Sequence, residues 1–272
     1  MFSAGRTINL TRTVSTGWTA TRKPGSNFGR PMLEGLYSAA AGMQAQQQRM
    51  DTVANDLANV NTTGYKHERV AFRDLLYVRD ASGRVQSGAG AAATTIGRGF
   101  AQGALRETGN PLDVAIEDGG FIQVRRADGT TALTRDGSLR LDPRGRLTTQ
   151  QGDLVQPAIT VPAGTQESAV QIGQNGAVTV NNRPIGTLQL FTVRSPEGLQ
   201  SVGDSLYRAT AQSGAVTRVA NGRMAQGSLE ASNVDVADTM TEMMDAQRSF
   251  QLASKAVQMQ DQLLQIANQV KS

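Results

Sequence analysis

Few side chains in this sequence could carry catalytic chemistry. His67 is the only histidine among 272 residues, the chain has no cysteine, and His67 stands between Lys66 and Glu68 in a polar segment. A lone imidazole without a second histidine or a thiolate does not complete the ligand set of a zinc site. We therefore expect no metal site, no cofactor and no catalytic role for His67.

The carboxylates that could act as acids or bases are better explained as turn residues. Asp128-Gly129 and Asp136-Gly137 are typical hairpin signals, and no Asp-x-Asp-x-Asp-Gly calcium loop accompanies them. Neither Gly-x-Ser-x-Gly nor the phosphate-binding Gly-x-x-x-x-Gly-Lys-Ser/Thr occurs. We therefore expect that the protein is not an enzyme. A deep polar pocket with converging carboxylates would support an enzyme instead.

Composition and charge exclude further classes. The formal net charge is +4, but five of the 27 basic residues precede Met32, which leaves 22 basic against 23 acidic residues in the rest. A balanced body argues against nucleic-acid binding. No apolar run is long enough to cross a membrane, and the leader lacks the apolar core of a cleaved secretory signal. We expect residues 1–31 to be disordered, with a basic arm or a true start at Met32 as alternatives.

The middle of the chain has the pattern of an antiparallel β domain. From 94 to 227, short alternating runs are separated by turn signals, including Asp118-Gly119-Gly120, Pro143-Arg144-Gly145 and Asn175-Gly176. Segment 78–93, rich in Gly, Ser and Ala, is typical of a flexible linker. The fold class predicted is α+β, with helical parts at 32–77 and 228–272 around the β domain.

Two long stretches with helical periodicity hold those outer parts, one from Leu33 to about Asn61 and one from about Asp235 to Lys271. Large apolar residues recur in each at heptad spacing, which indicates two helices paired as a coiled coil. The alternative is two amphipathic helices packed on a globular core. The residues expected in the seam between the helices are Leu36, Met43, Met50, Leu57, Met243, Phe250, Val257 and Leu264.

Small residues and amides alternate with these large ones. Ala40, Gln47 and Ala54 take the complementary positions in the first helix, and Ala246, Ala253 and Gln260 take them in the second. The second helix also carries apolar residues on a different side, so one intramolecular partner cannot bury both stripes. The residues expected to contact other copies are Leu252, Met259, Leu263 and Ile266.

Three segments resemble the axial proteins of bacterial flagella, the rod and hook subunits. The first is Val53 to Lys66. The second is Gly109 to Ile116, followed by Gly120 to Val124 and Leu133 to Ser138. The third is Glu230 to Val236, and the order is typical of that family. The third precedes the closing helix, where Asn233 or Asp235 is a suitable N-cap. The signature residues quoted for the resemblance are Asn55, Leu57, Asn59, Gly64, Tyr65, Lys66, Ser232, Asn233 and Val234.

The resemblance implies a structural subunit of the flagellar basal-body rod. Its terminal helices would assemble with other copies, and with neighbouring rod and hook proteins, into a tube around an export channel. The flagellar type III export apparatus would carry it to the periplasm-spanning rod without a cleaved signal. The modest β body favours the rod over the hook, and the distal over the proximal rod. The alternative is a coiled-coil-stalked binding or adhesin-like scaffold module.

Overall fold

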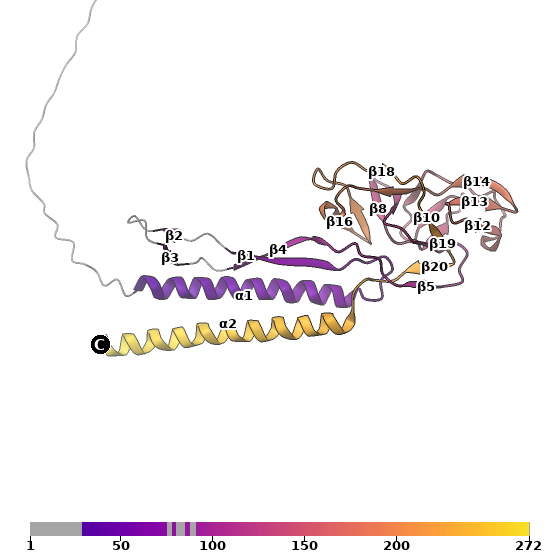
Figure 1. Cartoon of the computed structure of the whole chain (residues 1–272). Helices are drawn as coiled ribbons and strands as arrows, with labels where there is room; N and C mark the ends of the chain where they lie inside the picture. The colour runs from indigo at the N-terminus through magenta and orange to yellow at the C-terminus, as the bar shows by residue number, and fades with distance from the viewer. Residues whose placement is uncertain (1–28, 75–77, 80–84, 88–90, 272) are drawn as a thin grey trace, which may run out of the picture.

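A computed structural model of the chain describes residues 29–74, 78–79, 85–87 and 91–271 (Figure 1). Two long helices lie side by side at one end, and a body of short strands lies at the other. This is the predicted α+β arrangement, with a helix near each end of the chain and an antiparallel β domain between them in sequence. The predicted leader, 1–31, lies outside the described residues except for 29–31, which begin the first helix.

The helices are α1, Gly29–Ala58, and α2, Val236–Lys271. At 1.5 Å per residue, their 30 and 36 residues span about 45 and 54 Å. They run antiparallel, so that the end of α2 returns to the start of α1 (Figure 1). α1 ends three residues earlier than predicted, where the Asn59 amide donates to the backbone oxygen of Asn55 at 2.9 Å and competes with continued helix.

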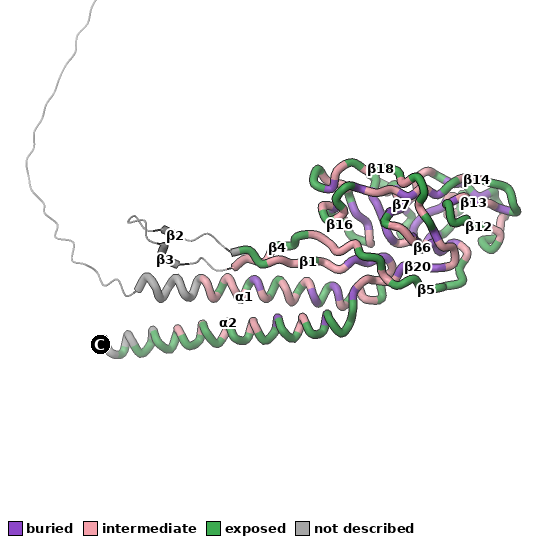
Figure 2. The backbone as a smooth tube through the Cα atoms, in the orientation of Figure 1, coloured by how far each residue is buried: buried purple, intermediate pink, exposed green. Residues whose placement is uncertain are grey.

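The burial pattern shows which helical faces a single chain covers (Figure 2). Ala246 is fully buried, whereas Ala40, Gln47 and Ala54 are exposed. Ala40, Gln47 and Ala54, which were predicted at the complementary positions of the seam, therefore do not lie in it, because α1 packs against α2 and the ribbon with other sides. The half-buried members of the predicted seam are Met43, Met50, Leu57, Met243, Phe250 and Val257. The side chains of Leu36 and Leu264 lie outside the described residues.

A two-stranded ribbon covers the side of α1 that faces away from α2 (Figure 1). It consists of β1, Glu68–Asp74, paired antiparallel with β4, Ala91–Arg98. Arg49 of α1 holds its guanidinium carbon 5.9 Å from the centre of the Phe72 ring of β1. The predicted linker, 78–93, includes β2, Val78–Arg79, β3, Val85–Ser87, and the first residues of β4.

The β body is antiparallel throughout its described pairings. Its largest sheet follows the order β16-β17-β8-β7-β11-β10-β9, with β15 joining β7 and β18 joining β15, and β12-β13-β14 form a second sheet. Two further strand pairs, β19-β6 and β20-β5, complete the β body. The strands are β5 Leu105–Glu107, β6 Val114–Ile116, β7 Phe121–Arg125, β8 Thr131–Thr134, β9 Leu139–Leu141, β10 Leu147–Thr149, β11 Leu154–Gln156, β12 Val170–Ile172, β13 Ala177–Val180, β14 Arg183–Thr187, β15 Leu190–Thr192, β16 Gln200–Gly203, β17 Leu206–Arg208, β18 Thr217–Arg218, β19 Met224–Gln226 and β20 Ser228–Glu230.

Three of the predicted turns close hairpins. Gly129, Gly145 and Gly176 have φ of 83°, 75° and 78° and lie between β7 and β8, β9 and β10, and β12 and β13. Gly137 differs, because β8 and β9 do not pair. A Cβ there would lie 1.7 Å from the oxygen of Val114, so this glycine permits a close backbone approach.

Two apolar clusters fill the body. The larger, which includes Val114, Ile122 and Leu147, lies among the strands of the sheets. The smaller contains Phe121 and Tyr207, whose rings both meet Phe100 edge to face. No helix in the described part of the chain is both long and apolar enough to cross a membrane.

Candidate functional site

The segment after α1 turns the chain towards the β body at Gly64. Its φ is 65°, and its N–H donates to the backbone oxygen of Glu230 at 2.9 Å. A Cβ at this position would lie 2.6 Å from the backbone nitrogen of Asp136. Glycine is therefore required both for the left-handed conformation and for the close contact with the β body.

Behind this turn lies a buried ionic cluster that joins the helices to the β body. Lys66 Nζ lies 2.6 Å from Oε1 of Glu230, and Arg135 NH1 lies 3.3 Å from Oε2 of the same carboxylate. Gly103 N–H donates to Oε1 at 2.8 Å, and Lys66 Nζ donates to the oxygen of Ala101 at 2.7 Å. Lys66, Arg135 and Glu230 are all buried, so one carboxylate holds two cations away from water.

Burial sets the electrostatics of this cluster. It lowers the pKa of Lys66 and of Arg135, because removal from water disfavours a cation, while the Glu230 carboxylate opposes both shifts. Arg135 also lies with its guanidinium carbon 5.0 Å from the centre of the Phe121 ring. The cluster can fix the geometry of the junction, because the Glu230 carboxylate pairs with both Lys66 and Arg135.

A second buried carboxylate ties the end of α1 to the ribbon. Asp56 Oδ1 accepts from Tyr65 Oη at 2.8 Å and from the Glu68 N–H at 3.2 Å, and Oδ2 lies 2.7 Å from His67 Nδ1. The Asp56 side chain is fully buried, whereas His67 is 37% exposed. Burial, and the bond to Asp56, raise the pKa of Tyr65. The bond to Asp56 raises the pKa of His67.

The start of α2 is held at the same junction. The side-chain oxygen of Asn233 accepts from the His67 N–H at 2.8 Å, and its amide donates to the oxygens of Gly99 and Ala101 at 2.7 and 3.1 Å. Asp235 caps α2, because its carboxylate accepts from the N–H groups of residues 237 and 238 at 2.8 and 3.2 Å. Of the two predicted caps, Asp235 takes the role, and Asn233 joins the start of α2 to the residues next to the ribbon strands, His67, Gly99 and Ala101.

The structure thus brings most of the quoted signature residues to one place. Gly64, Tyr65, Lys66 and Asn233 lie in the junction, and Val234 is buried beside it. The remaining ones have local roles. Asn59 bonds Asn55 within the last turn of α1 at 2.9 Å, Leu57 is half-buried, and Ser232 Oγ accepts from the N–H of Val234 at 3.3 Å.

Sequence reasoning missed Asp56, Arg135 and Glu230 as functional residues. Each lies inside a segment that carried the resemblance, but nothing in the sequence shows that its charge is buried. The sequence offers one indirect signal of a buried charge. Asp56 is an acidic residue within the predicted helix, seven residues after Arg49 and next to the predicted seam residue Leu57.

The outer face of α2 is the second candidate site. Leu252, Met259, Leu263 and Ile266 are 68%, 59%, 55% and 56% exposed. Met240 and Met244, nearer the junction, are each 50% exposed. These side chains are much more exposed than the half-buried seam residues, and a row of large apolar side chains in water is typical of a surface that another protein covers.

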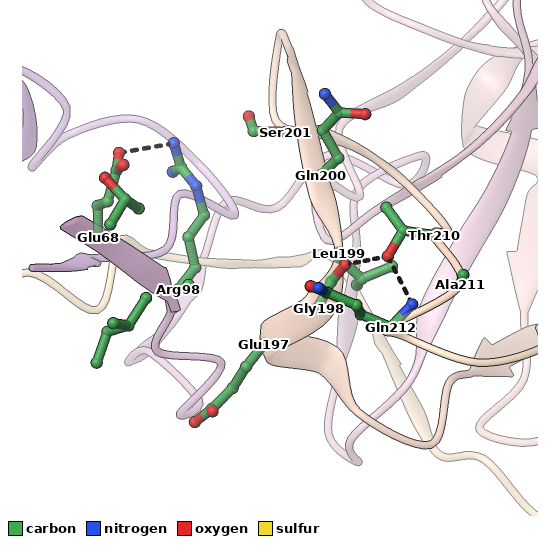
Figure 3. A pocket seen from close by; sticks show the side chains of 13 residues that line it. Glu68, Arg98, Glu197, Gly198, Leu199, Gln200, Ser201, Thr210, Ala211 and Gln212 are labelled. Atoms are coloured by element: carbon green, nitrogen blue, oxygen red, sulfur yellow. Dashed lines mark hydrogen bonds and ion pairs between the residues drawn. The ribbon is translucent and has the colours of Figure 1, made fainter. Parts of the chain in front are cut away.

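A pocket between the ribbon and the β body does not resemble an active site (Figure 3). It has a volume of about 570 Å³ and lies between the ribbon and the loops around Glu197 and Thr210. Its two carboxylates point apart and are already paired, Glu68 with Arg98 at 3.3 Å and Glu197 with Arg69 at 3.1 Å. Among the described residues, no three His, Asp or Glu side chains gather as a metal site would require.

Three stretches of the chain match described protein families. Residues 36–66 match "Flagella basal body rod protein", residues 115–180 match "Flagellar hook protein FlgE/F/G D1 domain", and residues 225–270 match "Flagellar basal body rod FlgEFG protein C-terminal". The first contains Lys66 and the third contains Glu230 and Asn233, while the second lies in the β body and contributes Arg135 to the junction.

Curated relatives extend the similarity over nearly the whole described chain. The flagellar basal-body rod protein FlgG of Borreliella burgdorferi is 39% identical, over 88% of this chain and 99% of its own. FlgG of Caulobacter vibrioides is 36% identical over 88% of this chain and 100% of its own. The flagellar hook-basal body complex protein FlhP of Bacillus subtilis is 31% identical over the same shares.

Proposed function

Because the chain belongs to the family of flagellar basal-body rod proteins, we propose that it builds the distal rod by self-assembly through its terminal helices. The chain is a structural subunit of the flagellar rod, a role in which it is not an enzyme. The proposal concerns how copies join. They form a hollow helical tube around the export channel, the tube transmits torque, and the β bodies lie on its outside.

The observation that supports this proposal is the exposed apolar face of α2. The exposed stripe of α2 consists of Leu252, Met259, Leu263 and Ile266. At 100° per residue, its centre lies roughly 160° around the helix from Phe250 and Val257. A single chain therefore covers one side of α2 and leaves the other in water. Full burial of each large side chain contributes about 1.5–3 kcal/mol, which gives assembly a substantial driving force.

The seam between α1 and α2 is, in this proposal, a short antiparallel coiled coil. The half-buried Met43, Met50, Phe250 and Val257 supply its large side chains. The ionic junction then serves to hold the β body at a fixed orientation to the helix pair. Torque passes from copy to copy only if that orientation is stiff, and buried, mutually paired charges resist bending because separation would leave them unpaired.

The partners follow from the same proposal. Copies of this chain meet one another and, at the ends of their segment, neighbouring rod and hook proteins. The flagellar type III export apparatus delivers the chain without cleavage of a signal peptide, which agrees with a leader that has basic residues but no apolar core. The working location is the basal body, where the rod spans the periplasm.

Assembly of the purified full chain tests the proposal against a stalked binding module. Sedimentation velocity over a range of concentrations, with negative-stain electron microscopy, distinguishes open from closed association. A rod subunit adds copies without limit above a critical concentration and forms hollow filaments. A small oligomer that stops growing as concentration rises would contradict the rod proposal and support the binding module.

A further inference from the structure

The exposed stripe of α2 carries charge as well as apolar surface. Arg248 and Lys255 are exposed, and by helical position they lie along one edge of the stripe formed by Leu252, Met259 and Leu263. No salt bridge within the described residues neutralises either cation. A surface that covers this stripe should therefore offer room for large side chains and an acidic group at its edge.

The outer face of α1 has these complementary properties. Its exposed residues are short or uncharged, except for Asp51, whose carboxylate accepts from the Gln47 amide at 3.0 Å. The short side chains of Ala40, Ala54 and Ala58 leave hollows on this face, into which a neighbour's large side chains can fit. The exposed residues of this face are Ala40, Gln44, Gln47, Gln48, Asp51, Ala54, Asn55 and Ala58.

These two faces do not meet within one chain. α2 packs on α1 with the side that carries Ala246, Phe250 and Val257, and the ribbon takes another side of α1 (Figure 2). The molecule thus presents a row of large apolar side chains on α2 and a face of alanines and polar side chains on α1, and both are in water.

We propose that the α2 stripe of one copy docks on the Ala40–Ala58 face of α1 in the next copy, with Arg248 and Lys255 near Asp51. This inference rests on the proposed rod function and specifies the two surfaces that join. A contact between two different patches is heterologous, so each added copy leaves one patch of each kind free. The stripe and the α1 face together therefore explain open-ended growth from a single type of contact.

The test uses two full-length variants, each blocked on one surface. Leu263→Asp places a charge in the α2 stripe, and Ala54→Arg places a large cation on the α1 face. Each variant has a matched control. Gln258→Asp places the same charge at an exposed position of α2 that lies about 100° or more from most of the stripe, and Ala54→Ser keeps the side chain short. Circular dichroism verifies that all four variants keep the wild-type helix content.

The expected result is complementation. Each blocked variant alone stays monomeric at concentrations at least tenfold above those at which the wild type and both controls assemble. Mixed in equal amounts, the blocked variants form a one-to-one dimer in native mass spectrometry, because each retains the surface that the other lacks, and growth stops there.

Two results would overturn the inference while leaving the rod function intact. Ala54→Arg could assemble like the wild type, which would show that the α1 face is not used. Alternatively, each blocked variant could fail to assemble and the mixture could still remain monomeric, which would show that the α2 stripe and the α1 face do not pair with each other. Failure of the wild type itself to assemble would instead contradict the proposed function. Failure of this inference and failure of the proposed function therefore give different results.

Discussion

Lys66 Nζ and Glu230 Oε1 are 2.6 Å apart, with both side chains fully buried, although the two residues are 164 positions apart in the sequence. One belongs to the segment that follows α1, and the other ends the strand that leads to α2. This ion pair, with Arg135, therefore joins the two ends of the chain to the β body.

Glu230→Gln should strongly destabilise the fold. Removal of the carboxylate charge leaves Lys66 and Arg135 as buried cations without a counter-charge, which typically costs about 3–5 kcal/mol. Urea unfolding followed by circular dichroism measures the free energy. Glu167→Gln, at an exposed position, is the control and should change it by less than about 0.5 kcal/mol. Equal effects of the two substitutions would contradict the role given to Glu230.

Gly64→Ala should cost more than the same change at a glycine in open space. Both Gly64 and Gly109 have positive φ, 65° and 72°, so both substitutions introduce backbone strain of about 1 kcal/mol. At Gly64 the new Cβ would also lie 2.6 Å from the nitrogen of Asp136, whereas at Gly109 nothing lies within 4 Å. The extra loss of unfolding free energy at Gly64, relative to Gly109, measures the cost of the close contact with Asp136. Equal losses would show that the backbone around Gly64 moves to make room for the Cβ.

Stability should fall as the pH rises through the titration of His67. The bond to Asp56 raises the pKa of His67, and Glu242 adds to this shift while burial and Arg69 oppose it. A raised folded pKa means that the protonated ring favours the folded state. The contribution is complete below the ordinary value of about 6.5 and is lost above the folded pKa.

The measurement is the melting temperature across pH 5.5–9 for the wild type and for His67→Gln. The wild type should lose stability relative to the variant as the pH increases from about 6.5, because only the wild type loses a proton at this site. Parallel curves would show that His67 titrates alike in the folded and unfolded chains.

Asp235→Ala should weaken the start of α2 by about 1 kcal/mol, because two N–H groups lose their acceptor. Asp235→Ser, which keeps an oxygen at the cap, should recover most of the loss. Hydrogen exchange of the first turn of α2 locates the effect. Unchanged exchange rates there in the alanine variant would show that Asp235 is not the effective cap.

The helices and the hairpins were predictable from the sequence because their signals are local. Heptad repeats placed α1 and α2 within a few residues, and Asp128-Gly129 and Asn175-Gly176 each closed a hairpin. Periodicity alone could not show that Ala40 and Ala54 face water, because the ribbon that competes for α1 comes from residues 68–74 and 91–98, which the predicted domain bounds divided among the helical part, the linker and the β domain.

The junction was not predictable from residue patterns for a different reason. Glu230 contacts Lys66 and Arg135 across 164 and 95 positions only after the β body has folded, and a sequence pattern does not reveal which distant charges become buried together. The resemblance marked the segments that meet there, but not the carboxylates of Asp56 and Glu230 that hold them.

The most direct test of the rod account is made in cells that assemble flagella. Basal bodies are extracted with detergent from cells that express the wild type, Leu263→Asp or Gln258→Asp, and this chain is quantified by mass spectrometry against known rod and hook components. The account predicts rod-like amounts for the wild type and Gln258→Asp, and loss of Leu263→Asp from the basal bodies at an equal cellular level. Wild-type amounts of Leu263→Asp in intact basal bodies would contradict the role of the α2 face, and absence of the wild type would contradict the rod function.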